Sequence, residues 1–325
     1  MDGLNSLQAI LGDELKKDFA LANLTTLKVG GPADLYLEAK TTDVLQKAIQ
    51  ESIKLKVPYT VLGGGSNILI GDKGIRGLVI RNMTRSVTIR GVKGKYENGN
   101  HVGEVYVEAD SGVIFNSLVR FTIEEGYKGI EMHLGLPGSV GGALYMNSKW
   151  TNPEGYVGNV LHSAVIITSE GEIKTVPREY FHFAYDESIL QKTKEIVLSA
   201  TFEFQRSTKE SLWDIANRSI AYRRTTQPQG VFTMGCTFQN ISKSEAFTIP
   251  TPLHTTSAGY LIDHAGLKGY TIGKAQVSPI HANFIVNQGG ATAAEIVKLI
   301  EHTRQIVKQK FGVSLKEEII RIGEF

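Results

Sequence analysis

The sequence predicts an α+β protein with more than one domain, on three observations. With 325 residues, 42% of them hydrophobic, the chain exceeds the roughly 250–300 residues at which a single core usually divides. Residues 35–39 alternate as in a strand, 43–55 carry apolar residues at helical spacing, and 59–62 follow a second strand pattern. A long C-terminal helix is predicted after Thr292, because Thr292 and Glu295 have capping-box spacing.

Further elements are predicted in chain order. They are a strand at 102–109, a helix at 113–125, strands at 163–168, 172–176 and 195–204, and a helix at 210–224. The polar run 205–211 is the best candidate for a domain boundary. We therefore predict one domain over 1–206 and a second over 207–325.

Charge, apolar runs and cysteine content exclude several classes of protein. The net charge is only +2, and no basic cluster with interleaved aromatic residues is present, so we expect no nucleic-acid partner. The first residues do not resemble a signal peptide, and no apolar run approaches the roughly 18 residues of a membrane span. A single cysteine, Cys236, fits a reducing compartment. We expect a cytoplasmic protein, without a membrane partner and monomeric.

Two glycine-rich segments could hold a diphosphate. The first, Gly63-Gly64-Gly65-Ser66-Asn67, follows a predicted strand; the second contains Pro137, Gly138, Ser139, Gly141 and Gly142. Successive backbone N–H groups without side chains allow phosphates to approach closely. One such cluster alone would be as consistent with a tight strand connection. Two clusters favour a nucleotide cofactor lying between the loops, and neither has the dinucleotide or P-loop fingerprint.

These segments, with several others, resemble the UDP-N-acetylenolpyruvoylglucosamine reductase family. The matching motifs are GGGSN, PGSVGGA, RR-x-TQP, GCTFQN, SAGYLIDHAGLKGYTIGKAQVS and the terminal Glu-Ile pair, in the family's order between about Asn23 and Gly323. The resemblance implies a two-lobed FAD-binding domain of the vanillyl-alcohol-oxidase type, with a break near residue 57, and a C-terminal α/β substrate domain. It also implies hydride transfer from NADPH to noncovalent FAD, and then to the enolpyruvyl ether of UDP-N-acetylglucosamine, giving UDP-N-acetylmuramate.

The resemblance assigns two catalytic residues. Cys236 stands where the family commonly has a serine proton donor, and a thiol with pKa about 8.5 is mostly protonated at neutral pH. The alternative for a lone cysteine is a small buried hydrophobe. Glu318 aligns with the family's catalytic glutamate, whereas the adjacent Glu317 is expected to be a solvated charge. The implied substrate contacts are Tyr185, Ser188, Arg223, Arg224, Asn240, Gln276 and Ser278.

One position departs from the family pattern. Asp186 stands where the family has an arginine that polarises the substrate carboxylate, and an aspartate would repel that anion. Three hypotheses stay open: another cation, Arg223 or Arg224, substitutes; the chain is a weak or non-catalytic flavin or UDP-sugar-binding paralogue; or it is a flavin enzyme with another substrate. His264 and His281 are interpreted as structural, and no metal site is predicted.

Overall fold

The computed structural model describes residues 2–97, 100–249 and 251–325, which form two compact units. Unit 1 consists of Met1–Lys17, Leu35–Gly64 and Gly77–Arg223, and unit 2 of Asp18–Asp34, Gly65–Arg76 and Arg224–Phe325. The chain therefore passes between the units several times. The boundary predicted at residue 206 lies inside unit 1, and two N-terminal segments cluster with the C-terminal residues.

The N-terminal part of unit 1 has a hydrophobic core of its own. Its elements are α1 (Asp2–Leu11), β1 (Lys16–Ala20), β2 (Pro32–Ala39), α2 (Thr42–Lys54), β3 (Tyr59–Leu62) and β5 (Ile75–Asn82), and the sheet order is β1-β2-β5-β3. Thr41 caps α2 by accepting from the N–H of Val44, and Leu45, Ala48 and Ile49 are buried. The predicted β-α-β pattern is confirmed, but β5 lies between its two strands because β3 pairs with β5 in parallel.

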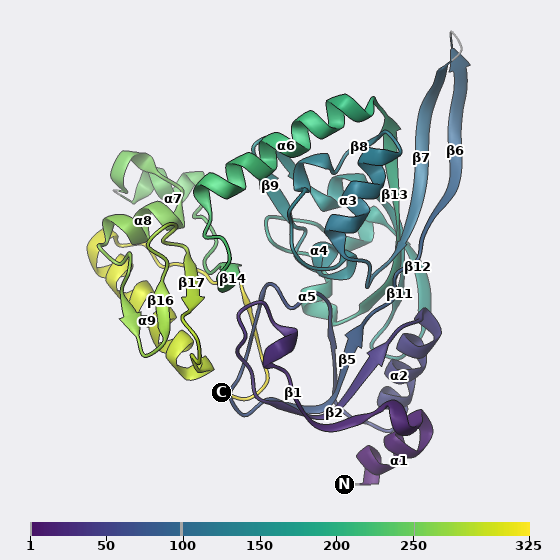
Figure 1. Cartoon of the computed structure of the whole chain (residues 1–325), viewed down its shortest axis with the longest axis horizontal. Helices are drawn as coiled ribbons and strands as arrows, with labels where there is room; N and C mark the ends of the chain where they lie inside the picture. The colour runs from purple at the N-terminus through teal and green to yellow at the C-terminus, as the bar shows by residue number, and fades with distance from the viewer. Residues whose placement is uncertain (1, 98–99, 250) are drawn as a thin grey trace. The chain divides into compact units, whose positions relative to one another are not determined.

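A six-stranded antiparallel sheet builds the rest of unit 1 (Figure 1). Its strands are β6 (Val87–Glu97), β7 (Asn100–Asp110), β8 (Tyr127–Lys128), β11 (Leu161–Ile167), β12 (Ile173–Pro177) and β13 (Ile196–Arg206). The order is β12-β11-β13-β7-β6, with β8 on β13. The other elements are β9 (Lys149–Thr151), β10 (Glu154–Tyr156), α3 (Phe115–Glu124), α4 (Val140–Tyr145), α5 (Leu190–Thr193) and α6 (Lys209–Thr226). Buried residues of α3 and α4 share one core with β7 and β13.

Unit 2 is built on a second antiparallel sheet with the order β14-β17-β16-β15. The elements are β14 (Phe232–Cys236), α7 (Lys243–Thr248), α8 (Ala258–His264), β15 (Thr271–Ile272), β16 (Ala275–Val277), β17 (Phe284–Asn287) and α9 (Ala293–Phe311). Helix α9 packs on β15 and β16. A separate parallel pair joins β4 (Ile68–Ile70) to β18 (Ile320–Ile322). Leu27, Val29 and Leu69 are buried in the same core as the C-terminal elements.

The α+β class and the long elements predicted from the sequence are confirmed. Helix α9 has the capping box of Thr292 and Glu295 at one end and Gly312 in a left-handed conformation at the other. The helix expected at 210–224 is α6, and the strands expected near 163–168, 172–176 and 195–204 are β11, β12 and β13. Among the described residues, none of the helices is long and apolar enough to cross a membrane.

Candidate functional site

The two glycine-rich loops meet in unit 1. A Cβ on Gly63 would lie 2.2 Å from Ser139 Oγ, and a Cβ on Gly64 would lie 2.3 Å from the Cα of Gly138. At Gly64 the clash would be with backbone, so the close approach of the two backbones requires glycine there; at Gly63 the Ser139 side chain would have to move. The loops, about seventy residues apart in the sequence, therefore lie against each other, and Gly63, Gly64 and Gly138 are only partly buried there, so that their backbone could face a diphosphate.

Helix α4 begins at the second loop and already uses some of its donors. Ser139 Oγ accepts from the N–H of Gly142 at 3.3 Å, and the N–H of Gly141 donates to Ser111 O at 2.8 Å. These two amides are held within the protein. The amides of Gly141 and Gly142 are therefore not available to a ligand as hydrogen-bond donors. The two loops meet at residues 63–64 and 138–139 instead.

Asp186 of unit 1 is paired with a lysine. The Nζ of Lys149 lies 2.8 and 2.9 Å from the two carboxylate oxygens of Asp186 and 3.4 Å from the centroid of the Tyr185 ring. The side chains of Lys149 and Asp186 are 13% and 4% exposed. Burial raises the pKa of Asp186, and the Lys149 ammonium opposes that rise. The site expected to carry an isolated negative charge thus contains a buried, neutralised pair.

The turn around Tyr185 is fixed by Ser188. Ser188 is fully buried, and its Oγ donates to Tyr145 O at 2.7 Å. Asp186 has a positive φ of 54°. Gln191 closes the turn by donating to the carbonyls of Tyr145 and Asp186. The backbone that presents Tyr185 and Asp186 is therefore held from within unit 1.

Arg223 stacks on an aromatic side chain of unit 1. Its guanidinium carbon lies 4.0 Å from the Trp150 ring centroid, and a Cβ on Gly135 would lie 3.3 Å from its Cδ. Arg223 also acts on the buried His133. Burial is the main cause that lowers the pKa of His133 to about 3, and the positive charge of Arg223 lowers it further. Arg223 therefore lies beside the second glycine loop, whereas Arg224 is the first residue of the long C-terminal segment of unit 2.

The two predicted catalytic residues are brought together in unit 2. The N–H of Glu318 donates to Thr237 O, the N–H of Gln239 donates to Lys316 O, both at 2.9 Å, and Phe238 and Glu317 form an isolated antiparallel bridge. Cys236, which ends β14, is partly exposed. The segment after Cys236 thus pairs with the segment that carries Glu318, over some eighty residues of intervening chain.

Glu317 is not the solvated charge that the sequence suggested. Its side chain is 17% exposed and forms ion pairs with Arg304 and with Arg321, the latter at 2.7 Å. Arg304 and Arg321 also pair with Glu301, and these carboxylates raise the pKa of Arg321 against the opposing effect of burial. The expectation was wrong because α9 brings Arg304 beside the C-terminal segment, and Arg321, four residues after Glu317 in that same segment, also pairs with it. Glu317 anchors the residue next to Glu318.

The remaining residues predicted in unit 2 make local hydrogen bonds. Asn240 Oδ1 accepts from the N–H of Ala258 at 3.1 Å, Gln276 Nε2 donates to Gly269 O at 3.2 Å, and Ser278 Oγ accepts from the N–H of Ile280 at 3.2 Å. His281 Nδ1 accepts from the N–H of Asn283, and His264 lies stacked on Tyr260, as expected of structural histidines. In the described part of the chain no group of three potential metal ligands occurs.

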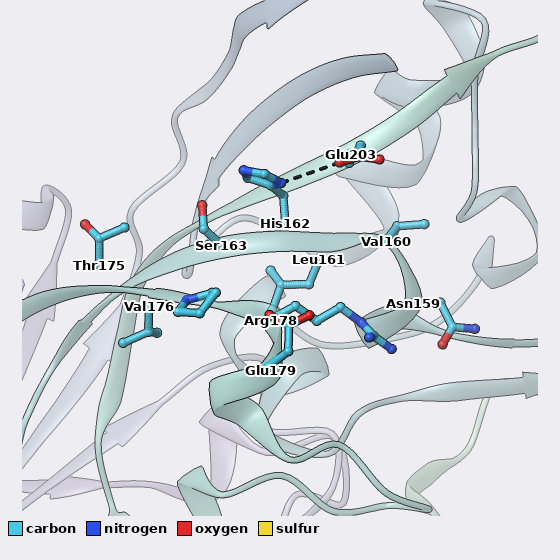
Figure 2. A pocket seen from close by; sticks show the side chains of 11 residues that line it. Asn159, Val160, Leu161, His162, Ser163, Thr175, Val176, Arg178, Glu179 and Glu203 are labelled. Carbon is cyan, nitrogen blue, oxygen red and sulfur yellow. Dashed lines mark ion pairs between the residues drawn. The ribbon is translucent and has the colours of Figure 1, made fainter. Parts of the chain in front are cut away.

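A pocket of about 870 Å³ in unit 1 lies apart from these residues (Figure 2). It is lined by β11, β12 and the turn after them, with His162 and Glu203 paired at 3.4 Å. Both side chains are well exposed, at 49% and 39%. None of the predicted site residues lines this pocket, so it is not part of the candidate site.

Sequence reasoning missed Lys149. No pattern connects it to Asp186, which lies 37 residues further along the chain. The available signal was its position, because Lys149 follows the second glycine loop after a single short helix.

Comparisons with known proteins agree with this architecture. Residues 33–177 match the family model described as "FAD binding domain", and residues 227–322 match "UDP-N-acetylenolpyruvoylglucosamine reductase, C-terminal domain". These two matches define a flavin-binding protein with a dedicated second domain.

Relatives along nearly the whole chain then identify the family. The UDP-N-acetylenolpyruvoylglucosamine reductase of Anoxybacillus flavithermus is 35% identical, and UDP-N-acetylenolpyruvoylglucosamine reductase 1 of Bacillus anthracis 37% identical; each match covers 98% of this chain and 97% of the relative. The crystal structure of the Thermus caldophilus reductase matches with a TM-score of 0.73 and 28% identity, over 95% of this chain and 98% of that one. The chain belongs to the UDP-N-acetylenolpyruvoylglucosamine reductase family.

Proposed function

We propose that this protein reduces UDP-N-acetylglucosamine enolpyruvate to UDP-N-acetylmuramate in peptidoglycan precursor synthesis, with FAD as cofactor and NADPH as electron donor. The observation that carries the proposal is the pairing of residues 237–239 with 316–318, which places Glu318 beside the residue after Cys236. A proton donor and a carboxylate are thereby fixed on adjacent segments. Reduction of an enol ether needs both a proton donor and groups that stabilise the charged intermediate.

The cofactor fits the surface between the two glycine loops. Gly63, Gly64 and Gly138 are partly exposed and carry no side chain, so bare backbone is available to a diphosphate there. We assign noncovalent FAD binding to this surface and its neighbours, namely Gly63, Gly64, Gly65, Ser66, Asn67, Pro137, Gly138, Ser139, Gly141 and Gly142. When bound, FAD supplies the hydride that it has received from NADPH.

Cys236 and Glu318 divide the remaining chemistry. The hydride adds to one vinyl carbon of the substrate, and the Cys236 thiol donates its proton to the other carbon. The resulting thiolate regains a proton from water, so that the protein returns to its starting state. Glu318 stabilises the intermediate around the substrate carboxylate. A reduced thiol is needed throughout, and this requirement supports a cytoplasmic location.

Lys149 is the substitute cation in this proposal. Its ammonium is held by both oxygens of Asp186 and by the Tyr185 ring. Asp186 balances its charge, and in this proposal the ammonium also donates a charge-assisted hydrogen bond to the substrate carboxylate at this turn. Arg223 is committed to the face of Trp150. We keep Tyr185, Ser188, Arg223, Arg224, Asn240, Gln276 and Ser278 as proposed contributors to the UDP-sugar site, and we expect a monomer.

Anaerobic stopped-flow absorbance tests the proposal directly. The NADPH-reduced protein is mixed with UDP-N-acetylglucosamine enolpyruvate, and reoxidation of the flavin is followed. We expect Cys236→Ala and Glu318→Gln each to slow reoxidation by about 10²–10⁴-fold, as for loss of a general acid. Cys236→Ser keeps a donor and should retain most of the rate. Glu324→Gln, an exposed carboxylate in the same C-terminal segment, is the matched control.

Two results would contradict the proposal. A flavin that binds and stays reduced in the unmodified protein would favour the non-catalytic paralogue. Equal rates for the unmodified protein, Cys236→Ala and Glu318→Gln would show that substrate is reduced without these two residues.

A further inference from the structure

The last residue of the GGGSN loop lies beside the C-terminal segment. Strands β4 and β18 are parallel, with Ile68 opposite Ile320. In a parallel pair the residues that precede each strand lie at the same end. Asn67, which directly precedes β4, is therefore placed beside residues 318 and 319, which directly precede β18.

Asn67 makes two hydrogen bonds across this junction. Its side-chain Nδ2 donates to Glu318 O at 3.1 Å, and its own carbonyl accepts from the N–H of Ile320 at 3.0 Å. The carboxamide side chain thus continues the parallel pairing of β4 and β18 by one step, to the carbonyl of Glu318 itself. A side chain without an N–H donor would lose this hydrogen bond.

Glu318 is held on its other edge as well. Its N–H donates to Thr237 O at 2.9 Å, so the two backbone groups of this one residue are bound by two different loops. The neighbouring Glu317 carboxylate is fixed by Arg304 and Arg321. The backbone that sets the direction of the Glu318 side chain is therefore fixed at three points, one of which is the side-chain hydrogen bond from Asn67.

We propose that Asn67 is a positioning residue for Glu318, in addition to any contact with the cofactor. The proposal rests on the proposed function, in which Glu318 acts on the substrate. Through Asn67 the last three residues of the GGGSN segment, 65–67, are joined to the backbone of Glu318 within unit 2. A displacement of a catalytic group by about 1 Å can cost roughly 100-fold in rate, so one hydrogen bond at this place has a measurable effect.

The test separates the two half-reactions of the FAD-loaded protein. In Asn67→Asp the shape is kept and the donor is lost, and in Asn67→Ala the whole amide is lost. Because Asn67 is also a proposed FAD contact, FAD is kept in excess so that both variants are loaded, and we expect reduction by NADPH to slow by a smaller factor than reoxidation. We expect reoxidation by UDP-N-acetylglucosamine enolpyruvate to slow by about 10- to 100-fold at saturating substrate. Agreement between the two variants excludes an effect of the new charge.

A double-mutant cycle tests whether Asn67 acts through Glu318. In the Glu318→Gln background, Asn67→Ala should slow reoxidation by a much smaller factor than in the unmodified protein, because the positioned carboxylate is already gone. Equal factors in both backgrounds would overturn the proposal. So would an equal slowing of reduction by NADPH in the FAD-loaded variants, since that would make Asn67 a cofactor ligand only.

Asn287→Asp is the matched control. Asn287 Nδ2 also donates to a backbone carbonyl of unit 2, that of Leu27, at 3.0 Å, and its Oδ1 accepts from the N–H groups of Gly289 and Ala291, so the aspartate loses the donor alone. We expect comparable thermal destabilisation but an unchanged rate of reoxidation. If substrate did not reoxidise the flavin of the unmodified protein, the proposed function itself would be wrong. If the unmodified protein were reoxidised and the Asn67 variants were reoxidised equally fast, only the positioning role of Asn67 would be wrong.

Discussion

At the scale of single residues, the imidazole of His133 is a buried titratable group. It is 0% exposed, and in the described part of the chain neither ring nitrogen has a hydrogen-bond partner. Its pKa is lowered from 6.5 to about 3, chiefly by burial. The neutral imidazole is therefore the folded form, and the unfolded chain takes up the proton first as the pH falls.

His133→Leu should make the protein more resistant to acid. Because the folded pKa lies below the unfolded one, His133 lowers stability progressively below about pH 6.5, by up to about 1.4 kcal/mol per pH unit. Leucine removes this dependence and also removes two unpaired polar atoms, which cost about 1–3 kcal/mol per group. Urea unfolding of both proteins at pH 7 and pH 5 measures the effect. A stability difference that does not grow toward pH 5 would contradict a lowered pKa.

The Lys149–Asp186 pair separates the reductase from the paralogue hypothesis. Asp186→Arg places a guanidinium against the buried Lys149 ammonium, and an uncompensated buried charge costs about 3–5 kcal/mol. We therefore expect reduced stability and lost turnover. If Asp186 were instead the defect of an inactive paralogue, the same substitution would raise activity. Steady-state kinetics with calorimetric unfolding distinguishes the two outcomes.

Lys149→Met tests the cation itself. We expect the KM for the enolpyruvate substrate to rise by at least about 10-fold, as for loss of a charged hydrogen bond worth about 1.5–3 kcal/mol. The variant also leaves Asp186 unpaired, which lowers stability. Lys149→Met combined with Asp186→Asn is the control, since it removes both charges and should recover stability without recovering KM. An unchanged KM in both variants would rule out Lys149 as the carboxylate-binding cation.

At the scale of elements, helix α9 is capped from two distant parts of the chain. Thr292 and Glu295 form the local capping box. In addition, the carboxylate of Asp72 accepts from the N–H of Ala293 at 2.7 Å and from that of Ala294 at 2.9 Å. A negative charge at a helix N-terminus also interacts favourably with the helix dipole. The loop after β4 thereby stabilises a helix that begins more than two hundred residues later.

Asp72→Ala should destabilise unit 2 by about 1–2 kcal/mol, the usual cost of a lost N-cap and its charge. Denaturant unfolding followed by a probe in unit 2 measures this loss. The neighbouring Lys73→Met is the control, because Lys73 is exposed and its substitution should change stability by no more than about 0.5 kcal/mol. Similar values for the two variants would mean that the Asp72 contact contributes nothing.

At the scale of the whole molecule, unit 2 is discontinuous in sequence. Its core contains Leu27, Val29 and Leu69 together with residues of α8 and α9, and strand β4 is the partner of β18. The segments Asp18–Asp34 and Gly65–Arg76 are therefore structural parts of this unit. The C-terminal hundred residues lack both segments and cannot complete their core alone.

A fragment of residues 224–325 should consequently fail to fold cooperatively. Without three buried side chains and the pairing strand, it leaves apolar surface exposed, each large side chain being worth about 1.5–3 kcal/mol. Near-UV circular dichroism and amide hydrogen exchange of the purified fragment measure the outcome against the full chain. A cooperative unfolding transition in the fragment would contradict the prediction.

Local chemistry in the sequence was sufficient for the elements and for most motif positions. Helix α9 was predictable from Thr292, Glu295 and its apolar face, because caps and helical spacing are interactions between near neighbours. Cys236 and Glu318 were identified by the resemblance of their motifs to a known family. The glycine loops were predictable for the same reason, since exposed backbone is a property of the loop itself.

Only the tertiary structure decided which of these parts meet. The contact of Gly63 and Gly64 with Ser139 and Gly138, the pairing of Lys149 with Asp186, and the bond from Asn67 to Glu318 all join segments far apart in the chain. Glu317 looked solvated because its partner Arg304 belongs to α9, which no spacing in the sequence connects to it. The physical reason is common to all four cases: backbone pairing and burial bring together side chains that no periodicity or spacing in the sequence connects.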